Sequence, residues 1–430
     1  MISAVRQTSD GIGSLLVFAD DWGRHPSSCQ HLVRQLMSRI PVTWVNTIGT
    51  RTPRLDLATL RRVREKLVQW SRRPDASDHI RLPSAPASVD EPTVLNPRMW
   101  PWFSGAFDRG LNRRLLARQL TPVIRSLPQP VIALTTLPIT ADLVGALPVS
   151  RWVYYCVDDF SQWPGLDGTT LRRMDIDMLR RADEIVVVSE TLRMLAADEG
   201  RTSTLLTHGV DVEFWRPRKH SSSGQPSSGQ SPFRAEQSAI SHIPGPRIVF
   251  WGVVDPRLCT NSLKKLSARL LADPQTARGK IILIGPQQNP DPEIIALPNV
   301  VTLPAQSMQA LPHIAAEADV LIMPYDDLPV TRAMQPLKLK EYLATGRPVV
   351  VNALPATVEW SDCMSVAQSP EQFAQLVLDR IQVPVSTAEQ AARNRLSAES
   401  WEAKARQLEQ VLHGSADVIS SRRQPEPKPA

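Results

Sequence analysis

The sequence of 430 residues has few cysteines and no close pair among them, since Cys29, Cys156, Cys259 and Cys363 are widely separated. Without a CxxC pair, neither a zinc site nor a disulfide framework is indicated, and a reducing compartment fits best. The sequence also lacks a long apolar run, and its N-terminus lacks a basic segment followed by an apolar one. We therefore expect a cytoplasmic protein with neither a transmembrane helix nor a signal peptide.

Motifs of nucleic-acid-binding domains are missing as well. The net charge of +6 is compatible with phosphates, anionic lipid or nucleic acid as partners. No helix-turn-helix, zinc finger or stacking platform accompanies the charge, so we do not expect nucleic acid as a partner. A hydrophobic content of 42% and a charged content of 21% are values typical of a globular protein.

What the chain does contain is an alternation of strand and helix patterns, and it is too long for one ordinary core. Short apolar runs predict buried strands, and amphipathic segments between them predict helices. In the first half the predicted strands are 14–19, 41–49, 131–138, 151–160 and 184–190, and the predicted helices include 29–40, 108–125 and 169–182. We expect a parallel sheet flanked by helices, in a first domain over 1–216.

A second α/β domain is predicted after a stretch rich in Ser, Gly, Gln and Pro, which cannot bury enough apolar surface to fold. We assign 217–245 to a linker or disordered insertion and 246–399 to the second domain. A last helix is expected over 400–413 and a disordered tail over 414–430. The strands expected in the second domain are 247–255, 280–286, 300–303, 318–325 and 348–354.

The segment MQPLKLKEYLATGRPVV, residues 334–350, carries the clearest chemical pattern. Pro336 and Gly346 suit the two ends of a short helix that follows a strand, at the edge of an open α/β sheet where ligands lie. Helix N-termini attract phosphate, so Lys338 can meet a diphosphate, and Glu341 can accept hydrogen bonds from a ribose. The alternative is an ordinary solvated helix face with paired charges.

This segment resembles the donor motif P-x-K-x-x-E-Y-L-A-x-G-x-P-V-V of GT-B glycosyltransferases, of the family-4-like, teichuronic acid or capsular polysaccharide type. Other landmarks of that family occur in order, namely VVVSETL (186–192), HGVDVEFWRP (208–217), FWGVVDPR (250–257) and ILIGP (282–286). The resemblance implies a GT-B fold, an α/β architecture in which two Rossmann-like domains with parallel sheets face each other across a cleft.

By this resemblance, Glu341 would bind the donor ribose, and Lys338 with the backbone at Pro336 and Leu337 would hold the diphosphate. Arg257, together with Lys264, would neutralise the leaving group, because fixed positive charge stabilises the phosphate as its charge develops. No metal and no cofactor is expected if these cations do so. The alternative for Arg257 is a solvated loop arginine.

One departure from the family pattern concerns stereochemistry. Retaining members often carry a second glutamate eight residues before the conserved one, and that position is Ala333 here. The alanine side chain has no carboxyl group, so it cannot act as an acid or a base. Either the mechanism does not need that group, or this chain resembles the inverting members, so the anomeric outcome stays open.

On the acceptor side, inversion requires a base that takes the proton of the attacking hydroxyl. Two carboxylate pairs follow predicted strands, Asp20 with Asp21 and Asp158 with Asp159, and the segment YYCVDDFSQWPG resembles one that supplies the base in the family. We favour Asp158 or Asp159 as the base; such carboxylates can also cap a helix or form a turn. His25 is an alternative catalytic residue, and Trp22 can stack on a sugar or pack in the core.

A basic segment with an apolar stripe, residues 51–73, fits either an interfacial helix on anionic lipid or a surface helix packed on its own domain. The aromatic run WPWF, residues 100–103, can add an anchor or fill a loop. We therefore expect that the protein can bind the inner face of the plasma membrane as a peripheral protein.

The function expected from the resemblance is transfer of a sugar from a UDP-sugar or GDP-sugar to a polysaccharide precursor, a lipid-linked glycan or another glycan acceptor. Two alternatives stay open. A nucleotide-sugar 2-epimerase shares the two-domain plan, and a non-catalytic protein that binds sugar nucleotides would tolerate the alanine at 333.

Overall fold

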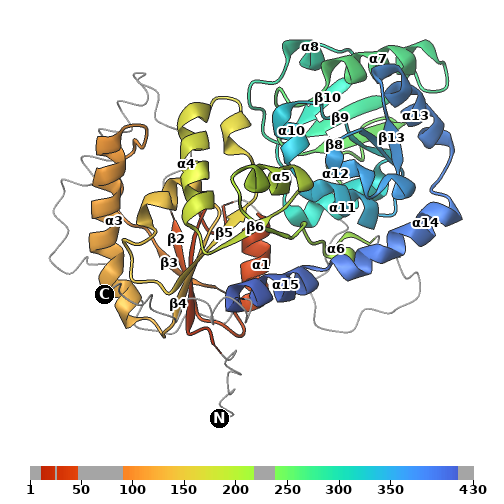
Figure 1. The fold of residues 1–430 in the computed structure, drawn as a ribbon. Helices are drawn as coiled ribbons and strands as arrows, with labels where there is room; N and C mark the ends of the chain where they lie inside the picture. The colour runs from red at the N-terminus through yellow and green to blue at the C-terminus, as the bar shows by residue number, and fades with distance from the viewer. Residues whose placement is uncertain (1–10, 25–26, 47–90, 217–237, 415–430) are drawn as a thin grey trace, which may run out of the picture. The chain divides into compact units, whose positions relative to one another are not determined.

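A computed structural model of the chain describes residues 11–24, 27–46, 91–216 and 238–414, which form two compact units. Unit 1 comprises Met1–His208, Ala333–Gln335 and Trp401–Ala430, and unit 2 comprises Gly209–Arg332 and Pro336–Ser400. Figure 1 shows a parallel sheet with helices around it in each unit. No helix among the described residues is long and apolar enough to cross a membrane.

Unit 1 contains a seven-stranded sheet in the order β3-β2-β1-β4-β5-β6-β7, and all its strand pairs are parallel. The strands are β1 (Ser14–Ala19), β2 (Val42–Asn46), β3 (Thr93–Leu95), β4 (Val131–Thr135), β5 (Arg151–Cys156), β6 (Glu184–Val187) and β7 (Thr204–Leu205). The α-helices are α1 (Ser28–Leu36), α3 (Ala106–Ser126), α4 (Gly168–Arg181), α5 (Glu190–Asp198) and α15 (Trp401–His413), with 3₁₀ turns η1 (Pro138–Leu143) and η2 (Phe160–Gln162).

Unit 2 contains a six-stranded sheet in the order β10-β9-β8-β11-β12-β13, again with parallel pairs throughout. Its strands are β8 (Arg247–Trp251), β9 (Lys280–Ile284), β10 (Val300–Leu303), β11 (Val320–Met323), β12 (Val349–Asn352) and β13 (Ser365–Ala367). The α-helices are α6 (Val212–Trp215), α7 (Thr260–Ala272), α8 (Pro292–Ile295), α9 (Leu311–Glu317), α10 (Pro329–Ala333), α11 (Leu337–Ala344), α12 (Pro355–Val358), α13 (Pro370–Gln382) and α14 (Thr387–Arg393). Short 3₁₀ turns are η3 (Met308–Ala310), η4 (Ser361–Cys363) and η5 (Asn394–Glu399).

The predicted fold class is confirmed, because both units are α/β with parallel sheets. Each central strand is apolar and buried along its length, as in β1 and β11, since helices cover both faces of such a sheet. The sequence missed the short edge strands β3, β7 and β13, which have too few residues for a hydrophobic pattern.

Several predicted strands extended too far at their carboxyl ends. The strand expected over 184–190 ends at Val187, because Ser189 caps α5 by accepting a hydrogen bond from the amide of Leu192. The strand expected over 151–160 ends at Cys156, and the residues after it enter η2. The apolar pattern thus continued into the loops at the edge of the sheet where ligands bind in such folds.

The end of the predicted linker packs against a domain. Ile240 and Ile243 are buried, and Ser241 donates a hydrogen bond of 2.7 Å to Glu317 in unit 2. In unit 1, α15 packs on α1, where His31 stacks on Trp401 with ring centroids 4.5 Å apart. The helix expected at 400–413 therefore begins one residue later, at Trp401, ends at His413 as expected, and contributes to the core of unit 1.

Candidate functional site

The sheet of unit 2 reverses its strand order between β8 and β11, so the loops that follow these two strands diverge at the carboxyl edge. The two loops are joined by backbone hydrogen bonds, since the amide of Cys259 donates to Pro324 at 2.7 Å and that of Asp326 donates to Arg257 at 2.8 Å. Leu258 and Tyr325 also form an antiparallel bridge. The result is a fixed frame at the point where an open α/β sheet binds ligands.

Lys338, on the first turn of α11, is held in this frame by two aromatic rings. Its Nζ lies 4.6 Å from the centroid of Phe250, at the end of β8, and 4.9 Å from that of Tyr325. The same Nζ donates a hydrogen bond of 2.5 Å to the hydroxyl of Tyr325. Ring faces attract a cation without neutralising it. We call Lys338, Phe250 and Tyr325 the lysine cage; it fixes a positive charge whose hydrogen bond goes to a neutral hydroxyl.

Gly252 leaves the space that the lysine occupies. It follows β8 with a φ of +144°, a region that L side chains rarely adopt, and a Cβ at this position would collide with Nζ of Lys338. Gly285, after β9, has the same φ, and a Cβ there would collide with the carbonyl of Gly252. Both glycines are therefore required by the packing of this edge.

Arg257 is a buried arginine rather than a solvated one, with a side chain 7% exposed. Asp255 holds it through hydrogen bonds of 3.0 Å from Nε and 2.7 Å from Nη2, and also accepts the backbone amide of Arg257 at 3.0 Å. The Arg257 guanidinium lies 5.7 Å from the ring centroid of Tyr325. The arginine is thus positioned beside the lysine cage, with its own charge matched by a carboxylate.

Glu341 lies one turn after Lys338 on α11 and is half-buried. Burial raises its pKa to about 7, against the opposing effects of the Trp251 indole and the Lys338 charge. Trp251 itself is 5% exposed, and its indole N–H lies close enough to the Glu341 carboxyl to lower that pKa. A carboxyl group with this pKa changes its charge near neutral pH, and its ionised form is a strong acceptor for hydroxyl donors.

The start of α11 offers backbone donors. Pro336 is the N-cap residue, one position before the first turn, and it makes no side-chain cap hydrogen bond. The amides of Leu337 and Lys338 therefore have no capping acceptor, which makes the helix start a site for an anion. Lys264 occupies a different position, on α7, where its Nζ pairs with Glu293 at 2.7 Å and the side chain is 48% exposed.

The predicted acceptor residues of unit 1 follow β1, at its junction with β4 where the strand order reverses. Asp20 is exposed, yet desolvation by the protein raises its pKa, opposed by hydrogen bonds from Ser27 at 3.3 Å and Gln30 at 3.1 Å. Asp21 pairs with Arg24 at 3.3 Å. These two carboxylates are already engaged within the loop and the first turn of α1.

Trp22 packs edge-on against the buried Trp44, with ring centroids 4.8 Å apart, and the guanidinium of Arg34 lies 5.2 Å from its ring centroid. The surroundings favour the packing alternative over stacking on a sugar. In the predicted aromatic anchor 100–103, Phe103 is 2% exposed and packs on Leu171 and Met174, so that side chain belongs to the core.

The second carboxylate pair follows β5. The carboxylate of Asp159 caps η2 by accepting from the amide of Ser161 at 3.0 Å and from its hydroxyl at 2.5 Å, which is the capping alternative. Asp158 precedes it in the loop and is half-buried. His25 and the segment 51–73 lie outside the described residues.

Sequence reasoning missed Phe250, Tyr325 and Asp255, the residues that hold Lys338 and Arg257 in place. A usable signal existed for Asp255, which lies two positions before Arg257 after a buried strand. Tyr325 and Phe250 read as ordinary strand residues, because a cage assembled from two strands and a helix has no local pattern.

Comparisons with known proteins agree with this architecture. Residues 245–382 match the family described as Glycosyl transferases group 1. The chain is 29% identical over 198 residues to "Putative teichuronic acid biosynthesis glycosyltransferase TuaH" of Bacillus subtilis (strain 168), and the match covers 44% of each chain. The aligned part thus spans less than half the length of that relative.

Solved structures match over nearly the whole chain. Sucrose-phosphate synthase from Thermosynechococcus elongatus gives a TM-score of 0.63 at 15% identity, covering 95% of this chain and 99% of that one. HepE from Anabaena in complex with UDP-glucose gives 0.58 at 12% identity, with coverage of 95% and 99%. The trehalose 6-phosphate synthase from Burkholderia multivorans gives 0.58 at 13%, with coverage of 97% and 100%. At these identities the likeness establishes the fold, which is GT-B as expected.

Proposed function

We propose that this protein is a glycosyltransferase that moves a sugar from a nucleotide diphosphate sugar to a glycan acceptor, such as a polysaccharide precursor or a lipid-linked glycan. The observation that carries the proposal is the lysine cage, a fixed cation at the start of α11 and at the strand-order reversal of unit 2. The match of residues 245–382 to a glycosyltransferase family supports it.

In this proposal the donor diphosphate lies at the start of α11. Lys338 and the amides of Leu337 and Lys338 hold its oxygens, since charge-assisted hydrogen bonds are the strongest available there. Arg257, fixed by Asp255, is a further hydrogen-bond donor for the leaving phosphate, while Lys338 supplies the net positive charge because Asp255 matches that of Arg257. These groups are positioned before the reaction, so they need no metal ion to stabilise the leaving group.

Glu341 accepts the hydroxyls of the donor ribose in this proposal, and the indole N–H of Trp251 stands beside it as a further donor. The donor nucleotide is a UDP-sugar or a GDP-sugar. Solved structures of this fold include HepE with UDP-glucose, which makes UDP-glucose the first donor to test.

The acceptor is assigned to unit 1, with Asp158 or Asp159 as the base. The carboxylate of Asp159 accepts hydrogen bonds from the amide and the hydroxyl of Ser161, and kinetics of variants at the two positions decide which of them is the base. Peripheral binding to the inner face of the plasma membrane remains part of the proposal for a lipid-linked acceptor. It is supported by Phe107, which is 76% exposed on α3, and is tested by cosedimentation with anionic and neutral vesicles.

Binding of UDP, GDP, ADP, CMP and dTDP, measured by thermal shift and calorimetry, tests the donor site. We expect one uracil or guanine nucleotide to stabilise the protein, with that affinity lost in Lys338→Ala. If no nucleotide binds, the donor assignment is refuted.

Product analysis separates the enzyme classes. Transfer requires both donor and acceptor, whereas a 2-epimerase would convert the donor alone. A non-catalytic protein would bind the nucleotide but give neither transfer nor hydrolysis with any acceptor.

A further inference from the structure

A cavity in unit 2 lies away from the proposed donor site. It has a volume of about 850 Å³ and is lined by α6, the end of α11, the turn before β12, the end of α13, α14 and η5. Asp319 and Pro348, which line it, directly precede β11 and β12. The cavity is therefore at the amino edge of the parallel sheet, opposite the carboxyl edge that carries the lysine cage. We call it the arginine hollow.

Four arginines line the hollow, and two of them have carboxylate partners. Arg216 pairs with Glu213 at 2.7 Å, and Arg380 donates to Glu389 at 3.0 Å. The Arg347 side chain makes no hydrogen bond or ion pair with the described residues, and the charge of Asp319 acts on it from a distance. Burial lowers the pKa of Arg347, with Asp319 opposing.

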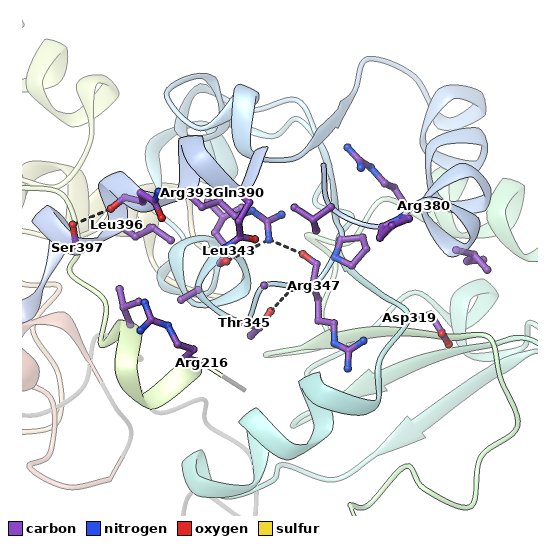
Figure 2. Close-up of a pocket in the computed structure, with 18 of the residues that line it drawn as sticks. Arg216, Asp319, Leu343, Thr345, Arg347, Arg380, Gln390, Arg393, Leu396 and Ser397 are labelled. Carbon is purple, nitrogen blue, oxygen red and sulfur yellow. Dashed lines mark hydrogen bonds between the residues drawn. The ribbon is translucent and has the colours of Figure 1, made fainter. Parts of the chain in front are cut away.

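The fourth arginine, Arg393, is 4% exposed and bonds only to backbone carbonyls. Its Nε donates to Cys363 at 2.9 Å and its Nη1 to Arg347 at 2.9 Å, while its Nη2 has no hydrogen-bond partner in the described residues. Figure 2 shows Arg393 among the lining residues, with the guanidinium of Arg347 extending away from it on the side of Asp319. Unmatched buried charge is costly, so an anion at this place would be favourable.

The rest of the lining sets the size and character of a ligand. Amide and hydroxyl side chains stand beside the arginines, namely Gln382, Gln390, Asn394 and Ser397, and none of the described lining residues is aromatic. The volume lies in the range of about 300 to 1,000 Å³ found for small-molecule sites. Without an aromatic platform, affinity must come from the arginines, whose planar forks suit phosphate oxygens.

We propose that the arginine hollow binds a phosphomonoester of small-metabolite size, such as a sugar phosphate, at a second site distinct from the donor site. The guanidinium groups of Arg347 and Arg393 have no carboxylate ion pair, and their charges are offset in part by Asp319 and Glu389. Two such groups suit the charge of a phosphomonoester better than that of a single carboxylate. Such a ligand would contact the end of α11 together with α13 and α14. Lys338 and Glu341 lie nearer the N-terminus of the same helix α11.

Calorimetric titration of the whole chain with glucose 6-phosphate, inorganic phosphate and glucose tests the proposal. We expect glucose 6-phosphate to bind, glucose not to bind, and Arg347→Gln to weaken binding by about tenfold or more, as for loss of one charge-assisted contact. The matched control is Arg278→Gln, which removes the same charge from an exposed position outside the hollow. Asp319→Asn removes the opposing charge and should tighten binding severalfold.

Lys338→Ala separates this site from the donor site. It should weaken nucleotide binding by about 10- to 100-fold and leave glucose 6-phosphate affinity unchanged, whereas Arg347→Gln should weaken glucose 6-phosphate binding and leave nucleotide affinity unchanged. Equal affinity of wild type, Arg347→Gln and Asp319→Asn for glucose 6-phosphate would refute the hollow as the site. Binding of inorganic phosphate as tightly as glucose 6-phosphate would refute a metabolite-sized ligand, and so would failure of both to bind.

Discussion

Unit 1 and unit 2 share one strand order around their central strands, yet they hold charged residues differently at the carboxyl edge of the sheet. In unit 2, Lys338 is fixed by two rings and Arg257 by a buried carboxylate. In unit 1, Asp20, Asp21 and Asp159 are partnered within their own loops or the next helical turn. A topology can therefore be repeated while only one copy builds a rigid cationic site.

This contrast has a physical reason. A diphosphate needs positive charge that is in place before it binds, because rearranging cations during the reaction would cost energy. A glycan hydroxyl needs one base and several adaptable contacts, which loops can supply. We therefore expect the two edges to respond differently to mutation: unit 2 variants should change donor affinity, and unit 1 variants should change turnover.

The largest effect is expected from the base in unit 1. Asp158→Asn should lower kcat by about 10²- to 10⁴-fold, the usual contribution of a general base, with the KM for the donor little changed. Asp159→Asn is the matched control and should have a much smaller effect on kcat, because its carboxylate caps η2. The reverse order in steady-state kinetics would transfer the base to Asp159, and normal turnover in both variants would exclude this loop.

Removing the caged cation should give the next largest effect. Lys338→Ala should weaken UDP-glucose binding by about 10- to 100-fold, the loss expected for one charge-assisted contact to phosphate. Lys264→Ala provides the comparison, since that lysine pairs with Glu293 at an exposed position and should leave the calorimetric affinity nearly unchanged. Equal losses in the two variants would mean that the cage has no special role.

Crowding the cage should have an intermediate effect. Gly252→Ala places a Cβ where Nζ of Lys338 lies and on a backbone with φ of +144°, so the lysine must move. We expect a roughly tenfold loss of UDP-glucose affinity and a small loss of thermal stability. Gly110→Ala, in the second turn of α3 with open space around it, is the control for the added methyl group. An unchanged affinity in Gly252→Ala would show that the lysine position is not critical.

The smallest effect is a pH dependence in unit 2 that unit 1 should not show. The pKa of Glu341 is raised to about 7 from an ordinary value of 4.5, so the folded protein binds this proton more tightly than the unfolded chain does. The contribution of Glu341 to folding stability is therefore complete below about pH 4.5 and is lost as the pH rises to about 7. Donor affinity should change in the opposite direction, rising about fivefold through pH 7 as the carboxylate ionises and accepts the ribose hydroxyls.

UDP-glucose is the suitable probe, because its diphosphate is esterified at both ends and does not titrate in this range. Glu341→Gln should flatten both profiles, as measured by calorimetry and by denaturant unfolding between pH 5 and 8. A wild-type affinity that does not vary with pH would remove Glu341 from the donor site.

Sequence patterns predicted much of this arrangement, although unevenly. The apolar strands were found because their burial demands continuous hydrophobic runs, and α11 was found because Pro336 and Gly346 mark its ends. The carboxyl ends of β5 and β6 were predicted too far along the chain, because apolar residues continue from these strands into the loops. Lys264 shows a different limit: the family resemblance suggested it for the donor site, and its contact with Glu293 from α7 is one that no local pattern predicts.

The sequence by itself determined the alternation of elements, the parallel sheets and the presence of Lys338 and Glu341 on one short helix, because these follow from hydrophobic periodicity and local capping. Only the tertiary structure decided that Lys338 lies between Phe250 and Tyr325, that Arg257 is held by Asp255, and that Arg347 and Arg393 line a hollow at the opposite edge. Such contacts join residues far apart in the chain, and their geometry depends on how strands and helices pack rather than on any local pattern.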